Sequence, residues 1–362
     1  MKKHRLISAL LLIWIPLLPG CGRKGPLLPP LMKTPKSVEA VSVHQRGGAA
    51  VVTWRNPTAY IDGSPLDQLE KVDIYMAQNP SEEFSSGIPE DLFREKARLI
   101  ETIPKDAIGE YFYPENLALL HFIHSFEIEA INTTLFAFAM KVTGGRGKES
   151  AFSSPVFLVP SPVSRPPQEL KARTEKDGVL LGWEPPDENI TGTTPALVQG
   201  YNIYKNSPEE EKTLRLNSSP HPETEFKDPQ VEWGVTYRYR VRAAVSRSSF
   251  YPESDDSETI EVTPRDTFPP EPPEGLTAIA GSGFVALSWR EPRAADLEGY
   301  RIWRRKKGEG KFTVLTQESI RDSSYIDRTV ESGMEYQYRV TAVDTAGNES
   351  AGSEAVTAEV RK

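Results

Sequence analysis

The residue with the clearest chemical potential is Cys21, the only cysteine in a chain of 362 residues. Basic residues crowd the first five positions, and a mostly apolar run from Leu6 to Leu18 leads to Gly20 and Cys21. This order is typical of a signal peptide that is cut after a small residue. The run is also short for a bilayer span, which needs about 20 apolar residues. We therefore expect residues 1–20 to be removed and the Cys21 thiol to carry a diacylglycerol lipid.

The same segment resembles bacterial lipoprotein signal peptides with their lipobox. Leu18, Gly20 and Cys21 match the lipobox, and Pro19 departs from it. The resemblance implies a covalent lipid on Cys21 and no other cofactor. Gly22 stands where aspartate would favour retention in the inner membrane, so the resemblance implies sorting to the outer membrane. We expect the anchored protein to face the periplasm. Two acyl chains suffice for stable anchoring. A plain secretory signal with an incidental cysteine is the alternative.

Residues 21–32 carry two cations and then a proline-rich apolar run, which is unsuited to a helix or a central strand. We interpret them as a stalk beside the membrane. The stalk also resembles the mature N-terminus of the small lipopolysaccharide-assembly lipoprotein family (LptM). That resemblance implies contact with the outer-membrane lipopolysaccharide translocon. The residues that match are Cys21, Gly22 and Lys24–Leu27, with the later Pro29–Pro30 pair. The partner-binding residues that the resemblance implies are Arg23, Lys24, Gly25, Pro26 and Leu27.

The other polar residues indicate no catalytic or metal site. His121 and His124 would lie on opposite faces of a strand, and could share a metal only on a helix. Glu209–Glu211 and Asp255–Asp256 lack the spacing of a calcium loop, so we interpret both as solvated loops. We therefore expect no metal and no enzymatic activity.

Composition narrows the class of protein further. Hydrophobic residues make up 38% of the chain and charged residues 26%, which is too polar for a membrane bundle. The formal net charge of −8 disfavours nucleic acid as a partner. With its single cysteine acylated, the exported chain can form no disulfide. Its domains must then be held together by their cores.

One pattern occurs three times after the stalk. Each copy has an apolar alternation that ends in tryptophan, at Trp54, Trp183 and Trp289, and a later ladder of alternating aromatic or apolar residues. Short alternating runs separated by proline and glycine predict an all-β fold of three tandem sandwiches. Proline-rich joints separate the copies. The expected domains are residues 33–160, 165–264 and 270–362.

The copies resemble the fibronectin type III domain, most clearly in Gly234–Tyr237 and Gly333–Tyr336. The resemblance implies a tyrosine corner at Tyr237 and Tyr336, in which the hydroxyl bonds to nearby backbone. The first copy departs from the pattern, with Phe136 at the tyrosine position. It is also longer, and its insertion contains a short helix expected within Pro89–Ile100.

The ladders differ in their alternate residues. The second copy has Arg238, Arg240 and Arg242 there, and the third has Gln337, Arg339 and Thr341, as a solvated face would. The first copy has Ala137 and Ala139, so its outer face must be covered. We expect the insertion or a neighbouring domain to cover it, with a partner protein as the alternative.

These features together predict a membrane-anchored, non-catalytic envelope lipoprotein that binds or scaffolds another protein. The expected partners are the membrane, through the lipid, and an envelope protein, which the N-terminal motif suggests is the lipopolysaccharide translocon. The alternative is an accessory lipoprotein that binds carbohydrate or peptidoglycan through its sandwich loops.

Overall fold

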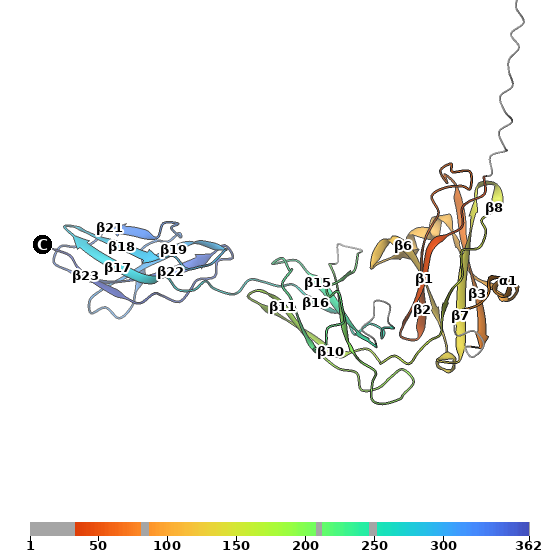
Figure 1. Cartoon of the computed structure of the whole chain (residues 1–362). Coiled ribbons are helices and arrows are strands. Elements are labelled where there is room, and N and C mark those ends of the chain that lie inside the picture. Colours follow the sequence, from red (N-terminus) through yellow and green to blue (C-terminus); the bar gives the residue numbers. More distant parts are fainter. Residues whose placement is uncertain (1–32, 81–86, 208–211, 246–251, 362) are drawn as a thin grey trace, which may run out of the picture.

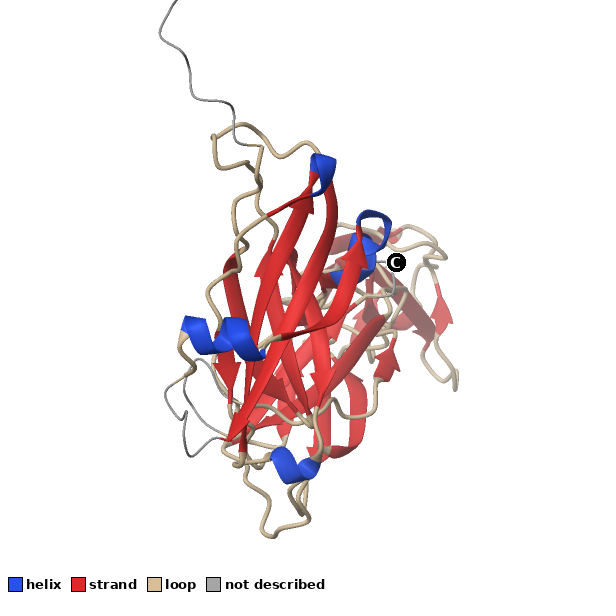
Figure 2. Cartoon of the chain, turned by 90° about the vertical axis from the view of Figure 1, so that its right-hand side faces the viewer, coloured by secondary structure: helices blue, strands red, loops and turns tan. Residues whose placement is uncertain are grey.

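The computed structural model describes residues 33–80, 87–207, 212–245 and 252–361. These residues form three β-sandwiches that follow one another along the chain (Figure 1), so the all-β prediction is confirmed. Helical segments are short and lie outside the sheets of the first sandwich (Figure 2). None of the described helices is long and apolar enough to cross a membrane. The stalk residues Cys21–Leu27, and Glu209–Glu211, lie outside the described part.

The first sandwich, which we call D1, has two antiparallel sheets. One has the strand order β1-β2-β6-β5, and the other has the order β4-β3-β7-β8, with β9 also paired to β7. The strands are β1 (Glu39–Arg46), β2 (Ala49–Arg55), β3 (Leu69–Pro80), β4 (Arg98–Pro104), β5 (Phe112–Tyr113), β6 (Asn116–Ser125), β7 (Thr134–Gly144), β8 (Lys148–Glu149) and β9 (Val156–Leu158). Short 3-10 turns cover Lys105–Tyr111, Ile128–Ala130 and Gly145–Gly147.

The second and third sandwiches, D2 and D3, repeat one topology, with a three-stranded sheet facing a four-stranded one. In D2 the sheets are β10-β11-β14 and β13-β12-β15-β16; in D3 they are β17-β18-β21 and β20-β19-β22-β23. The D2 strands are β10 (Gln168–Glu175), β11 (Gly178–Glu184), β12 (Gly200–Asn206), β13 (Leu214–Arg215), β14 (Glu225–Asp228), β15 (Tyr237–Ala244) and β16 (Ile260–Val262). The D3 strands are β17 (Glu274–Gly281), β18 (Phe284–Arg290), β19 (Leu297–Lys306), β20 (Thr313–Val314), β21 (Ser324–Asp327), β22 (Glu335–Asp344) and β23 (Val356–Glu359).

The cores follow from the alternation in the sequence, because successive side chains of a strand point to opposite faces. Each sandwich buries its own apolar cluster, with Trp54, Trp183 or Trp289 inside it. The hydroxyl oxygen of Tyr237 accepts a hydrogen bond from the backbone N–H of Glu232 (3.0 Å), and that of Tyr336 accepts one from Glu331 (3.1 Å). These two contacts have the geometry of a tyrosine corner.

The insertion of D1 covers the outer face of its β3–β7 sheet. Helix α1 (Glu90–Lys96) places Phe93 in a second apolar cluster with Ala137 and Ala139, all three of them buried. The expectation that the insertion covers this face is therefore confirmed. The helix is shorter than predicted, because Arg98–Pro104 pairs with β3 as an added strand, β4.

Candidate functional site at the junction of D1 and D2

The backbones of D1 and D2 are joined where the β1–β2 hairpin of D1 meets a D2 segment that follows β15. The N–H of Gly47 donates to the carbonyl of Glu253 (2.8 Å), and the N–H of Glu253 donates to the carbonyl of Gln45 (3.2 Å). Gly47 has a φ of +52°, and a Cβ at this position would overlap the carboxylate of Asp255. Glycine is therefore required here by both conformation and space.

Gln45 ties the same hairpin to the segment that leaves D1. Its side chain is 1% exposed. Nε2 donates to the carbonyls of Gly47 (3.0 Å) and Ser161 (2.9 Å), while Oε1 accepts from the N–H of Ser161 (2.9 Å). A buried amide whose donors and acceptor all have partners fixes the position of the backbone around it. The exit from D1 and the docking hairpin are thus held together.

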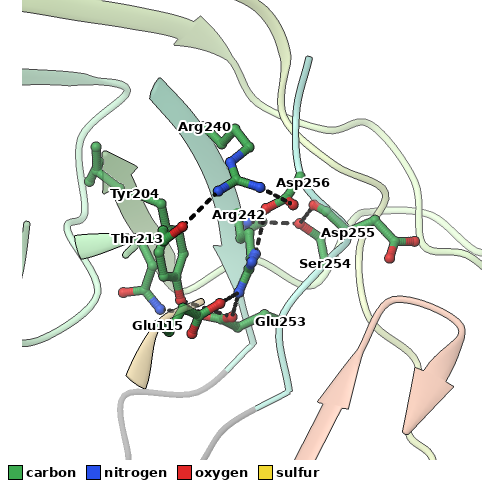
Figure 3. Close-up of polar contacts among 12 residues, drawn as sticks. Glu115, Tyr204, Thr213, Arg240, Arg242, Glu253, Ser254, Asp255 and Asp256 are labelled. Carbon is green, nitrogen blue, oxygen red and sulfur yellow. Dashed lines mark hydrogen bonds and ion pairs between the residues drawn. The ribbon is translucent and has the colours of Figure 1, made fainter. Parts of the chain in front are cut away.

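Arg242, on β15 of D2, is the centre of the junction (Figure 3). Its side chain is 2% exposed and contacts three carboxylates. Nη1 lies 2.9 Å from Glu115 and 3.0 Å from Glu253, and Nε lies 2.6 Å from Asp256. Glu115 belongs to D1, in the turn between β5 and β6. A single guanidinium therefore connects the two sandwiches.

The ring of Tyr204, on β12, supports this guanidinium from one side. The Arg242 Cζ lies 4.1 Å from the ring centroid, a cation–π distance. The Tyr204 hydroxyl donates to Glu253 (2.8 Å to Oε1), and Asn202 Nδ2 donates to the same carboxylate. Glu253 is thereby held in one orientation, ready to pair with Arg242.

Another contact between D1 and D2 lies beside the Arg242–Glu115 pair. The N–H of Thr213 donates to the carbonyl of Pro114 (2.7 Å), the residue before Glu115. Arg240 donates to the Thr213 hydroxyl (3.2 Å) and to Asp256 (3.3 Å). The turn of D1 is therefore recognised by a backbone hydrogen bond as well as by charge.

The electrostatics of the cluster favour its charged form. Burial alone would lower the pKa of Arg242, but Tyr204 and the carboxylates of Glu115, Glu253 and Asp256 raise it well above its usual value. Burial would raise the pKa of Glu115, and Arg242 outweighs this and lowers it. The pKa of Asp256 is lowered for the same reason. A buried ion pair such as Arg242–Glu115 adds little net stability to the fold. Removing one partner nevertheless leaves the other charge buried without compensation.

The neighbouring ionisable groups are shifted towards their neutral forms. Burial lowers the pKa of His44, even though Glu253 and Glu115 lie nearby. Burial is also the largest cause of the raised pKa of Asp255. The Tyr113 ring centroid lies 6.3 Å from that of His44 and 5.5 Å from that of His121, and its hydroxyl donates to Glu115 (2.7 Å). The junction therefore carries titratable groups close to its charged centre.

The structure corrects two expectations from the sequence. Arg242 is buried rather than solvated, and Asp256 pairs with it in the junction, while Asp255 is exposed as expected of a loop. Spacing alone could not show this, because the partner carboxylate of Glu115 comes from a different sandwich, 127 positions away. The histidine expectation holds: His124 packs on Phe136 and Phe138 in the core, while His121 contacts Tyr113 on the other face.

The joint between D2 and D3 is different in kind. Asp266, Asp296 and Asp344 bring carboxylate oxygens within 4.8 Å of one another. Asn348 Nδ2 donates to Asp344 Oδ2 (2.9 Å) and to the carbonyl of Asp266 (3.3 Å), which ties the linker to a turn of D3. The Asn348 amide and the neighbouring carboxylates thus fix the linker to D3.

The fold and its repeated faces define a class, the tandem β-sandwich proteins with fibronectin type III architecture. Residues 271–359 match the family model of the fibronectin type III domain, which is itself a non-catalytic module. D3 is therefore the copy that this family model matches. D1 and D2 share the sandwich fold with it.

Several larger proteins are similar to parts of this chain. Exoglucanase B of Cellulomonas fimi is 28% identical over 237 residues, which is 62% of this chain and 20% of that protein. The amylopullulanase of Thermoanaerobacter thermohydrosulfuricus is 36% identical over 29% of this chain and 7% of its own length. The fast-type myosin-binding protein C of Homo sapiens is 23% identical over 58% of this chain and 18% of its own.

The chain thus spans a fifth or less of the length of these relatives. Among solved structures, the crystal structure of chicken CNTN1 FN1-FN3 domains is 16% identical and covers 91% of this chain and 99% of its own, with a TM-score of 0.28. The shared part of the relatives indicates an accessory, non-catalytic module.

Proposed function

We propose that this protein is a lipid-anchored envelope protein whose sandwiches dock other proteins. The observation that carries the docking role is the junction itself. The outer face of the D2 four-stranded sheet binds a carboxylate-bearing turn of D1 through Arg242, Tyr204 and Thr213. A sheet face of this molecule therefore packs against a turn of another domain of the same chain, which supports a docking role. The accessory nature of the domain in the relatives supports the same role.

The anchoring part of the proposal rests on the sequence of residues 1–32. The lipid is carried by Cys21, Gly22 directs the protein to the outer membrane, and the body of the protein lies in the periplasm. Residues Arg23–Leu27 would then contact the lipopolysaccharide translocon. The support for these statements is the resemblance of the segment to lipoprotein signal peptides and to the LptM family.

Two measurements test the anchor and the motif separately. Mass spectrometry of the purified protein should find diacylglycerol on Cys21 and no residues 1–20, and Cys21→Ser should release the protein from the membrane fraction. An unmodified thiol would overturn the anchor. For the motif, crosslinking in intact cells should recover the translocon with the native chain and lose it when residues 22–30 are replaced by a Gly/Ser segment. Recovery from both would overturn the role of the motif.

A carbohydrate-binding accessory role is the second candidate. The similarity to exoglucanase B and amylopullulanase favours it. Residues 33–362 should then pellet with insoluble cellulose, starch or peptidoglycan and be released by the matching soluble oligosaccharide. No retention on any of the three polymers would leave the protein-docking proposal as the better one.

A further inference from the structure

D3 has an outer face built at the same positions as the D2 face that holds D1. On β19 and β22, Tyr300, Ile302, Tyr338 and Val340 are fully buried, so the residues between them point outwards. Cross-strand pairing then sets Trp303 opposite Arg339. The outward residues are Arg301, Trp303, Arg305, Gln337, Arg339 and Thr341. We call this set the D3 face.

The side chains of the D3 face are already held in place. The Phe312 ring lies under two guanidiniums, with Cζ of Arg305 4.6 Å and Cζ of Arg339 4.7 Å from its centroid. Arg305 Nε donates to Gln337 Oε1 (2.7 Å), and Trp303 Nε1 donates to Thr341 Oγ1 (3.0 Å). Contacts of this kind reduce the side-chain entropy that a partner would have to remove on binding.

The positions correspond pairwise with those of D2. Tyr204 pairs with Arg240 across β12 and β15, just as Trp303 pairs with Arg339. Each domain then places a glutamate beside these strands. Glu253 accepts hydrogen bonds from Tyr204 and Arg242, and Glu349 accepts them from Thr341 and Arg301. Both glutamates directly precede a serine, Ser254 or Ser350, whose Oγ accepts a backbone N–H of β15 or β22.

The edge strands correspond as well. Arg215 of β13 pairs with Tyr204, and Val314 of β20 pairs with Trp303. Counting back two residues, Phe312 occupies the place of Thr213, whose N–H donates to the carbonyl of Pro114 in D1. D3 therefore has the same edge position from which D2 recognises a turn.

The difference lies in what covers the two faces. At the matched positions, the Arg240 side chain of D2 is 25% exposed beside the D1 turn, whereas Arg339 of D3 is exposed. D3 lies away from D1 (Figure 1). Its face carries three guanidiniums, from Arg301, Arg305 and Arg339, and Glu349 is paired with the first of them. This leaves an excess of positive charge on a protein whose formal net charge is −8.

We propose that the D3 face binds an acidic turn of a partner protein, a turn of the kind that D1 offers to D2. Its carboxylate would pair with Arg339 and Arg305, a backbone carbonyl would accept from the N–H of Phe312, and an apolar neighbour would pack on Trp303. Arginine and tryptophan are the residues that most often dominate binding energy at protein interfaces. The proposal deepens the docking role above and does not depend on the lipid anchor.

The test is calorimetric titration of the full chain with a cyclic peptide that carries residues 111–118. The same titration is done with a control peptide that carries the substitution Glu115→Gln. The first peptide should bind at least about tenfold more tightly than the second, since a charge-assisted contact is lost in the latter. Arg339→Glu should weaken binding of the first peptide at least about tenfold. Arg290→Glu makes the same change of charge on the opposite sheet of D3, where the arginine is 74% exposed, and should leave affinity unchanged.

Several outcomes would overturn the proposal. These are no saturable heat, equal affinity for the two peptides, or equal loss in Arg339→Glu and Arg290→Glu. Tighter binding of an RNA oligonucleotide or of phosphatidylglycerol vesicles than of the peptide would also overturn the proposal. Either result would indicate that the D3 face binds phosphate groups rather than carboxylates. An unchanged melting temperature in Arg339→Glu shows that the fold is intact. Arg305→Gln, a milder change, should weaken peptide binding by a smaller factor than Arg339→Glu does. Failure of the peptide to bind would leave the anchor untouched, because that is measured by mass spectrometry.

Discussion

The outer faces of the four-stranded sheets in D2 and D3 have the same plan and different environments. In D2 the face is closed by D1, and an arginine at position 242 contacts carboxylates from both domains. In D3 the matching position is Thr341, which bonds to Glu349 within its own domain. D1 provides a third solution, because its own helix α1 covers the equivalent face with Phe93. The three sandwiches therefore share one sandwich scaffold, but a different set of residues covers or occupies the outer sheet face of each.

Removing the central guanidinium should have the largest effect on this contrast. Arg242→Ala leaves three carboxylates near one another without their common partner, so we expect a loss of about 3–5 kcal/mol in unfolding free energy. Urea denaturation of residues 33–362 measures it. Arg238→Ala, on the same strand, removes only an exposed pair with Glu261 and should cost less than about 1 kcal/mol. Similar losses in both variants would show that the junction does not depend on Arg242.

The backbone contact can be tested independently of charge. Gly47→Ala forces an alanine to a φ of +52° and pushes its methyl group into Asp255, so we expect a loss of about 2–4 kcal/mol. Gly63→Ala is the matched control, because Gly63 has a φ of +81° and open space around it. It should cost only about 1–2 kcal/mol. Denaturation curves of the two variants give the difference, and equal costs would mean that Asp255 yields without strain.

A smaller effect should follow from neutralising the D1 side of the junction. Glu115→Gln keeps the shape of the side chain and removes the charge on Arg242's partner, which should cost about 1.5–3 kcal/mol. Glu129→Gln changes an exposed carboxylate elsewhere in D1 and should be nearly neutral. The melting temperatures of the two variants decide the matter. A stable Glu115→Gln would indicate that Glu253 and Asp256 suffice for Arg242.

The pH dependence of stability should be the smallest of these effects. The folded-state pKa of His44 lies below 6.5 because burial disfavours the charged ring. The unfolded chain therefore takes up this proton first, so stability present above about pH 6.5 is lost as the pH falls through the folded pKa. Asp255, with a raised pKa, acts in the opposite direction at lower pH.

We expect the melting temperature of residues 33–362 to fall between about pH 7.5 and 5.5. His44→Gln should reduce that fall, while the lowered pKa values of His121 and His124 keep part of it. A fall of unchanged size in His44→Gln would assign the whole effect to those two residues.

Much of the fold could be predicted from the sequence. The alternation that ends at Trp54, Trp183 and Trp289 and the later ladders report burial, and burial is decided within each sandwich. The apolar alternation at Ala137 and Ala139 also predicted a covered face, which the insertion covers. These are local signals, because period-two patterns depend only on neighbouring residues.

The junction could not be predicted in this way. Arg238, Arg240 and Arg242 look alike in sequence, yet only Arg242 is fully buried, because the D1 turn lies over one end of the strand. A contact between positions 115 and 242 depends on how two domains pack, and no periodicity encodes that. One indirect signal exists: Asp255–Asp256 follows Glu253 closely, a density of carboxylates that an arginine-rich strand would attract.

The reliance of D2 on a turn of D1 has a consequence for the order in which the chain matures. D1 is synthesised first and can complete its β5–β6 turn before Arg242 exists. D2, in contrast, reaches its final state only when that turn is in place, since Glu115 comes from outside it. A shortened protein that began at residue 165 would expose Arg242 and Tyr204, because it lacks the D1 turn that covers them. We expect such a fragment to self-associate through this exposed surface more readily than the whole chain.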